Sequence, residues 1–201
     1  MALSYILSYY SYHIYLILTN NSIKHNDPNN TNRVAHLTFI HLIMVIKHIV
    51  ISGGGPTGLL SYGAAKHLAQ QGFWSHDTVE TIYGTSIGSL IGAMVCLKHE
   101  WSTLDDYIIK RPWEKVIADS LEVFELFSYK GMAKLKLMDD IMRPLLESKD
   151  LTLAITLREF YEYSRISLNV FTVDLNTFQK VQLSHATHPT LPLMDAIKMS
   201  C

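Results

Sequence analysis

The sequence of 201 residues has little of what several protein classes require. Its 17 basic residues are balanced by 18 acidic ones, and it has no block of like charges that could hold a nucleic acid. Its only cysteines, Cys96 and Cys201, form no CxxC pair, and its 10 histidines show no metal-ligand spacing. We therefore expect no nucleic-acid partner, no disulfide framework and no metal. Cys96, within an apolar stretch, is expected to be a small buried residue.

Hydrophobic residues make up 48% of the chain and charged residues 17%, which is typical of one globular domain. The first 18 residues are apolar and rich in tyrosine, but they have no basic start and no cleavage site, so they make a poor signal peptide. An asparagine-rich linker follows at residues 19–33. We expect residues 1–43 to lie outside the fold, or alternatively to anchor it to a membrane, and residues 44–201 to form the domain. A cytoplasmic or peripheral membrane location is expected.

The patterning of the domain predicts an α/β fold with a parallel sheet covered by helices. Strands are expected at residues 45–52 and 79–83, and helices at 58–71 and 86–98. A helical middle region follows at residues 103–147, broken at Pro144. Trp113, Phe124 and Phe127 lie in that region, either as core residues or as contacts to a lipid surface. Thr156 and Glu159 form a capping box, and a hairpin at residues 166–184 precedes a last helix from Leu193.

The sequence Gly84-Thr85-Ser86-Ile87-Gly88 is a GxSxG motif between a strand and a helix. A strand that enters a helix directly makes a sharp turn with a strained residue at its tip, which exposes the serine hydroxyl. The two glycines permit the close approach that this turn requires. The motif predicts that Ser86 is a nucleophile, and the alternative is a glycine turn with a capping serine.

A second glycine-rich segment, Gly53-Gly54-Gly55-Pro56-Thr57-Gly58, follows the first strand of the domain. Glycines let backbone amides point toward a developing oxyanion without obstruction by side chains, and Pro56 has no amide to donate. We predict that this loop is an oxyanion hole.

The same loop fits the G-x-G-x-x-G pattern of dinucleotide-binding folds, which leaves a flavin or nicotinamide binder as an alternative. That fold needs an acidic residue at the end of the second strand, whereas Glu80 lies near its start. A nucleotide-binding P-loop fits less well, because Leu59 and Leu60 stand where lysine and serine or threonine are required.

The two motifs, in this order and context, resemble the patatin-like phospholipase family, and the similarity extends from about Lys47 to Cys201. The resemblance implies a three-layer α/β/α fold with a mainly parallel central sheet. It also implies hydrolysis of lipid acyl esters, with phospholipid as a candidate substrate at a membrane surface, by a Ser–Asp dyad without a cofactor. Ser86 would be the nucleophile, and Gly54 and Gly55 would donate oxyanion amides.

Two departures from the family pattern matter. A basic residue often precedes the last glycine of the loop in the family, and here it is Thr57. The dyad aspartate belongs to a DG[AG] motif, and the sequence has no Asp-Gly pair. Neither Asp174 nor Asp195 matches it, so the resemblance is to a domain incomplete at its C-terminus, in which we expect little turnover. The alternatives are a catalytically inactive lipid-binding remnant and a triad of Asp174 with His185 or His188.

Overall fold

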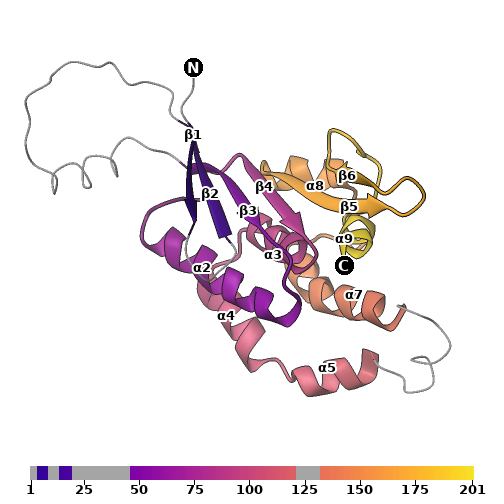
Figure 1. The fold of residues 1–201 in the computed structure, drawn as a ribbon. Helices are drawn as coiled ribbons and strands as arrows, with labels where there is room; N and C mark the ends of the chain where they lie inside the picture. Colours follow the sequence, from indigo (N-terminus) through magenta and orange to yellow (C-terminus); the bar gives the residue numbers. More distant parts are fainter. Residues whose placement is uncertain (1–3, 9–13, 20–45, 121–131) are drawn as a thin grey trace, which may run out of the picture.

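The structure is a computed structural model that describes residues 4–8, 14–19, 46–120 and 132–201. Its centre is a sheet in the order β1-β2-β3-β4-β5-β6 (Figure 1). The three central strands β3, β4 and β5 are parallel, while β1, β2 and β6 pair antiparallel. The strands are β1 (Ser4–Ser8), β2 (Ile14–Thr19), β3 (Ile46–Ile51), β4 (Thr81–Thr85), β5 (Ser167–Asp174) and β6 (Gln179–Leu183).

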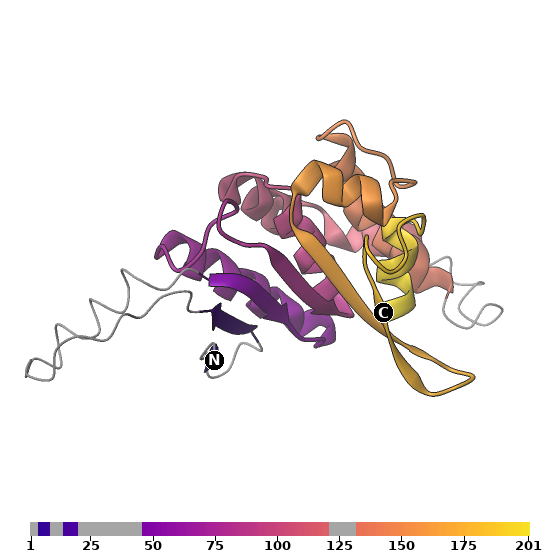
Figure 2. The same cartoon turned by 90° about the horizontal axis from the view of Figure 1, so that it is seen from above.

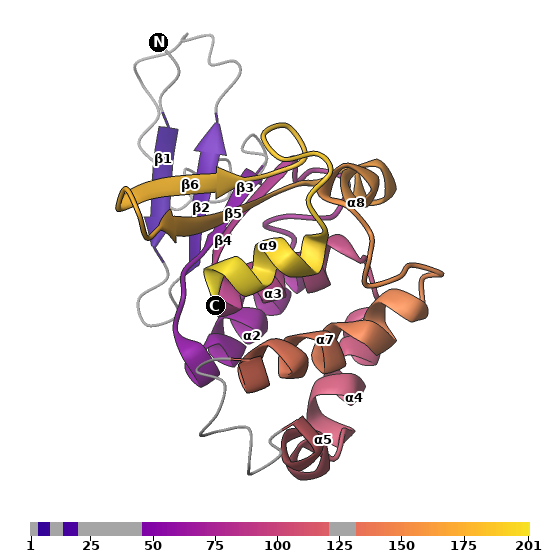
Figure 3. The same cartoon turned by 90° about the vertical axis from the view of Figure 1, so that its right-hand side faces the viewer.

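Helices flank this sheet, which confirms the α/β fold class. In Figure 3, α3 and α9 lie between the sheet and α7. The helices are η1 (Gly55–Thr57), α2 (Gly58–Gln70), α3 (Ile87–Cys96), α4 (Trp101–Lys110), α5 (Trp113–Ser120), α7 (Met132–Glu147), α8 (Leu157–Ser164) and α9 (Leu193–Ser200). None of the helices in the described ranges is long and apolar enough to span a membrane.

The N-terminal strands differ from expectation. We expected residues 1–43 to lie outside the fold, but β2 pairs antiparallel with β3 and β1 pairs with β2. The physical reason is that β3 would otherwise be an edge strand with unpaired backbone groups, and the apolar β-branched run Ile14–Thr19 can satisfy them. The domain boundary at residue 44 itself stays a prediction.

The core lies between the central strands and α3. Every residue from Gly88 to Cys96 in α3 is buried, as expected for a helix that is apolar on all sides. Cys96 is fully buried, as predicted, and burial raises the pKa of its thiol to about 12. The opposite face of the sheet carries three half-buried rings, with His48 and Phe171 on either side of Tyr83.

The middle helices correct one expectation. We expected Pro144 to break its helix, but α7 continues through it to Glu147. Pro144 has no amide to bond the Asp140 carbonyl four residues earlier. The Arg111 guanidinium donates to that carbonyl at 2.8 Å, so the acceptor that proline leaves free is satisfied by the residue that follows α4.

Local signals at the helix ends behave as predicted. The Thr156 hydroxyl accepts the Glu159 amide, and the Glu159 carboxylate accepts the Thr156 amide, which completes the capping box.

Trp113 lies among the helices, where its indole donates to the Ile108 carbonyl at 2.6 Å and its ring meets Tyr107 edge-on. Phe124 and Phe127 lie outside the described residues.

Candidate functional site

Ser86 occupies the turn between β4 and α3. Its backbone has φ 54° and ψ −129°, a region that L residues rarely adopt, and the helix begins at the next residue. The Ser86 carbonyl accepts both the amide and the hydroxyl of Ser89, at 2.8 and 2.6 Å. Two further bonds therefore hold the strained residue in place, at the N-terminus of a buried helix whose dipole favours negative charge.

The glycines on either side of Ser86 are required by space. A Cβ at Gly84 would lie 2.6 Å from the Ser89 Cα, and a Cβ at Gly88 would lie 2.3 Å from the Ile51 carbonyl oxygen. Both distances are to backbone atoms, so no side-chain rotation can relieve them. The sharp turn expected from the GxSxG pattern is therefore present, and it presses against the end of β3.

The glycine loop lies directly beside this turn. A Cβ at Gly53 would lie 3.3 Å from the Ser86 Cβ, and a Cβ at Gly58 would lie 2.4 Å from the Ile87 Cγ2. Gly55 has φ 54°, and the Thr57 hydroxyl donates to the Gly54 carbonyl at 2.6 Å. The structure thus brings together the two segments that the sequence singled out, although they are about thirty residues apart in the chain.

Three further residues meet at the elbow, the turn from Gly84 to Gly88 between β4 and α3, and were not found from the sequence. The Ser86 amide donates to the Ser200 hydroxyl at 2.8 Å, and that hydroxyl donates to the Phe171 carbonyl at 2.5 Å. The Cys201 thiol interacts with the hydroxyls of Ser86 and Ser89. Only the packing of α9 beside β5 places Ser200 and Cys201 here, and no local pattern marks them.

The Cys201 thiol is not a base for Ser86. Burial raises the pKa of Cys201, and the bonds from the two serine hydroxyls offset this only in part. The thiol is therefore protonated at neutral pH. Within the described residues, no carboxylate or imidazole hydrogen-bonds the Ser86 hydroxyl.

The Asp174 and histidine triad is not assembled. The Asp174 carboxylate accepts the Asn176 amide at 2.8 Å and the Thr177 hydroxyl at 3.0 Å, and these bonds lower its pKa. His185 stacks on Tyr161 with ring centroids 3.7 Å apart, near the start of β5. Ser86 follows the end of the neighbouring parallel strand, so the imidazole lies at the opposite edge of the sheet. His188 follows His185 closely, and its Nδ1 lies 3.0 Å from the Thr187 hydroxyl.

The side chains that the two nucleotide-binding alternatives require are not in the required positions. Glu80 precedes β4, and its carboxylate pairs with Lys47 at 2.5 Å, so it is at the wrong end of the strand to bind a ribose. Leu59 and Leu60 are both 53% exposed at the start of α2, where a P-loop would present its lysine and hydroxyl.

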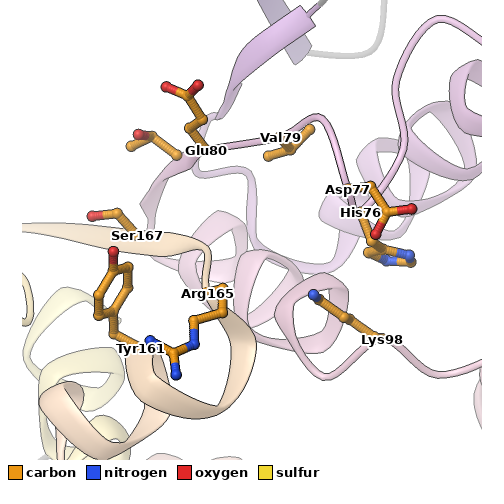
Figure 4. Close-up of a pocket in the computed structure, with 9 residues that line it drawn as sticks. His76, Asp77, Val79, Glu80, Lys98, Tyr161, Arg165 and Ser167 are labelled. Carbon is orange, nitrogen blue, oxygen red and sulfur yellow. The ribbon is translucent and has the colours of Figure 1, made fainter.

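A hollow of about 640 Å³ lies at the other edge of the sheet (Figure 4). Thr81 and Ser167, which begin β4 and β5, line it together with Lys98 and Arg165. Because Ser86 follows the last residue of β4, this hollow does not belong to the elbow.

The fold and the elbow define an α/β protein with a strained serine between a central strand and a buried helix. A model of the patatin-like phospholipase family matches residues 49–201, and the chain belongs to that family. An uncharacterized protein of Acanthamoeba polyphaga mimivirus, R571, is 24% identical over 158 residues. That alignment covers 77% of the present chain and 51% of the relative, so the chain matches about half the relative's length.

A solved structure shows the same fold. It is the heterodimeric complex ExoU–SpcU from the type III secretion system of Pseudomonas aeruginosa, with a TM-score of 0.52 and 14% identity. The similarity covers all of the present chain and 42% of that chain. At this identity it supports the architecture alone.

Proposed function

We propose that the chain is a serine hydrolase of lipid acyl esters in which Ser86 is the nucleophile. Members of the patatin-like family are lipid hydrolases, which supports the reaction class. The observation that carries the residue assignment is the Ser86 backbone at φ 54° and ψ −129°, held between β4 and α3. Strain of this kind costs about 1–3 kcal/mol and persists at functional sites, where it presents a side chain for reaction.

In the proposed reaction the Ser86 Oγ attacks the acyl carbon of the ester and transfers its proton to a base. The carbonyl oxygen becomes an oxyanion, which the amides of Gly54 and Gly55 stabilise in the loop from Gly53 to Gly58. The C–O bond to the alcohol then breaks, the alcohol leaves with the proton, and water hydrolyses the acyl-enzyme. No cofactor is needed. The family resemblance assigns the base to an aspartate in a motif that follows the last helix of this chain.

A second candidate function is a lipid-binding protein without turnover. It is favoured by one observation: within the described part of the chain, the Ser86 hydroxyl meets the neutral Cys201 thiol and no base. Without a base, a serine hydroxyl is a weak nucleophile at neutral pH.

Labelling with a fluorophosphonate probe tests the proposal. We expect labelling of a chain extended beyond Cys201 to include an Asp-Gly motif, and complete loss of labelling in its Ser86→Ala variant. Ser102→Ala is the matched control, because Ser102 is exposed on α4 away from the elbow. Labelling that is absent from the extended chain would leave the lipid-binding remnant as the better description. Labelling that persists in Ser86→Ala would show that another residue is the nucleophile.

We further propose that residues 44–201 form the catalytic domain, and that the protein acts in the cytoplasm or at the periphery of a membrane. Fractionation of cells that express the chain from Met44 onward tests the role of the first 43 residues. Unchanged membrane association of that shorter chain would show that these residues are not an anchor.

A further inference from the structure

The hairpin of β5 and β6 carries two exposed apolar side chains at its tip. Leu175 and Phe178 are each 78% exposed, more than any other large hydrophobic residue within residues 46–116 and 136–201. Single exposed apolar residues are common on protein surfaces, but two at one projecting turn are a localised feature. Figure 2 shows the hairpin extending away from the helices.

The tip is held in one shape by hydrogen bonds. The Asp174 carboxylate accepts the Asn176 amide and the Thr177 hydroxyl, and the Asp174 carbonyl accepts the Phe178 amide at 2.7 Å. Asp174 and Gln179 are the last paired residues of the two strands, so only four residues form the turn. Leu175 and Phe178 are therefore presented on a fixed turn.

Phe178 also adopts a backbone conformation that does not suit it. Its φ is 53°, in the left-handed region where glycine is free of strain and a bulky side chain is an outlier. The aromatic ring is largely exposed, so packing within the described fold does not offset this strain. The turn between Asp174 and Gln179 accounts for the positive φ, whereas the exposed ring has no role in the packing of the fold.

The tip lies at the same edge of the sheet as Ser86. Phe171 of β5 pairs with Thr85 of β4, which immediately precedes Ser86. Leu175 follows Phe171 by four residues, and at about 3.3 Å per residue it lies roughly 13 Å farther along the strand direction. Figure 3 shows the hairpin tip on the same side of the fold as the end of α9, whose Ser200 bonds the Ser86 amide. A surface that met the tip would face the elbow.

We propose that Leu175 and Phe178 insert into the acyl region of a lipid surface. This insertion would orient the protein so that the edge of the sheet that carries Ser86 faces the lipid. The choice of a lipid partner rests on the proposed function. The exposed Lys180 stands beside the tip, with its ammonium 5.2 Å from the centroid of the Phe171 ring, and from there it can also meet lipid phosphate groups. The one carboxylate of the turn, Asp174, is already bonded within it. A shallow apolar projection with a cation at its base fits an interface between headgroups and acyl chains.

Sedimentation with phosphatidylcholine vesicles tests this proposal. The protein is the full chain with Ser86→Ala, so that binding is measured without turnover. We expect Leu175→Ser combined with Phe178→Ser to weaken vesicle binding at least about tenfold. Ile109→Ser is the matched control, since Ile109 is 75% exposed on α4, and its vesicle binding should stay within about twofold of the parent.

The single variant Phe178→Gly separates a lipid contact from a structural role. Glycine removes the ring and relieves the positive φ, so vesicle binding should fall while the thermal midpoint rises. Equal vesicle binding by the parent and the double variant would overturn the proposal, as would a parent that does not bind vesicles. A double variant that loses self-association in place of vesicle binding would also overturn it, by identifying a protein contact. None of these results bears on fluorophosphonate labelling, which tests the hydrolase separately.

Discussion

The sharpest structural prediction concerns Gly88. An alanine at this position would place its Cβ 2.3 Å from the Ile51 carbonyl oxygen and 2.8 Å from that of Ser52. Carbon–oxygen contacts are normally about 3.3 Å or longer, so the end of β3 would have to move by about 1 Å. Overpacking of this size costs about 3 kcal/mol or slightly more, and alanine returns about 1 kcal/mol through its better helix propensity.

The expected result for Gly88→Ala is therefore a net loss of about 2–3 kcal/mol in the free energy of unfolding, or a thermal midpoint lower by about 4–12 °C. Because Ser52 leads into the glycine loop, Ser86 labelling by a fluorophosphonate should also fall. Urea and thermal unfolding measure the first effect, and labelling of the extended chain measures the second.

Gly63→Ala is the matched control. Gly63 lies in α2, and a Cβ there meets nothing within 4 Å. Alanine at this position should stabilise the protein by about 0.5–1 kcal/mol. If Gly88→Ala unfolded at the same urea concentration as the parent, the close contact between α3 and the end of β3 would be refuted.

Three further predictions concern strain, pH and the proline helix. Ser86→Gly should raise the free energy of unfolding by about 1–2 kcal/mol while abolishing labelling, because glycine relieves the positive φ and removes the hydroxyl; an unchanged unfolding midpoint would contradict the strain. Burial lowers the pKa of His99 below its ordinary 6.5, so the unfolded chain takes up its proton first as pH falls. The contribution of neutral His99 to the free energy of unfolding should thus be fully present above pH 6.5 and decline below it, by at most about 1.4 kcal/mol per pH unit. Urea unfolding at a series of pH values should show this decline in the parent and a smaller one in His99→Gln. Arg111→Met should destabilise the protein by about 1–2 kcal/mol, and by less in a Pro144→Ala background, where an amide again reaches the Asp140 carbonyl; equal losses in both backgrounds would refute the compensation.

The local elements were predictable because their signals are local. A β-branched run that ends in glycines predicted β3, and Gly72 after α2 adopts the positive φ of 76° that ends the helix. The Thr156 capping box was equally readable, since its two partners are three residues apart. The course of α7 through Pro144 was not, because the donor that replaces the missing amide comes from Arg111, 29 residues away from Asp140.

The residues of the candidate site also fall into two groups, those predictable from local sequence and those placed by tertiary packing. Ser86 and its neighbouring glycines were found from the GxSxG spacing, because this motif reflects the backbone conformation of a turn only a few residues long. Ser200 and Cys201 were not found, because their positions depend on how α9 packs beside β5. The insertion of the N-terminal strands beside β3 was also missed, since sheet pairing between distant segments leaves no local pattern.

The sequence by itself determined that a serine stands at a strained turn beside a glycine loop, because glycine and a strand–helix junction dictate backbone geometry locally. The tertiary structure alone decided what surrounds that serine. It brought the Ser200 hydroxyl to the Ser86 amide, placed His185 at the opposite edge of the sheet and carried Leu175 and Phe178 past the elbow. These placements follow from strand register and helix packing, which are set by burial across the whole fold.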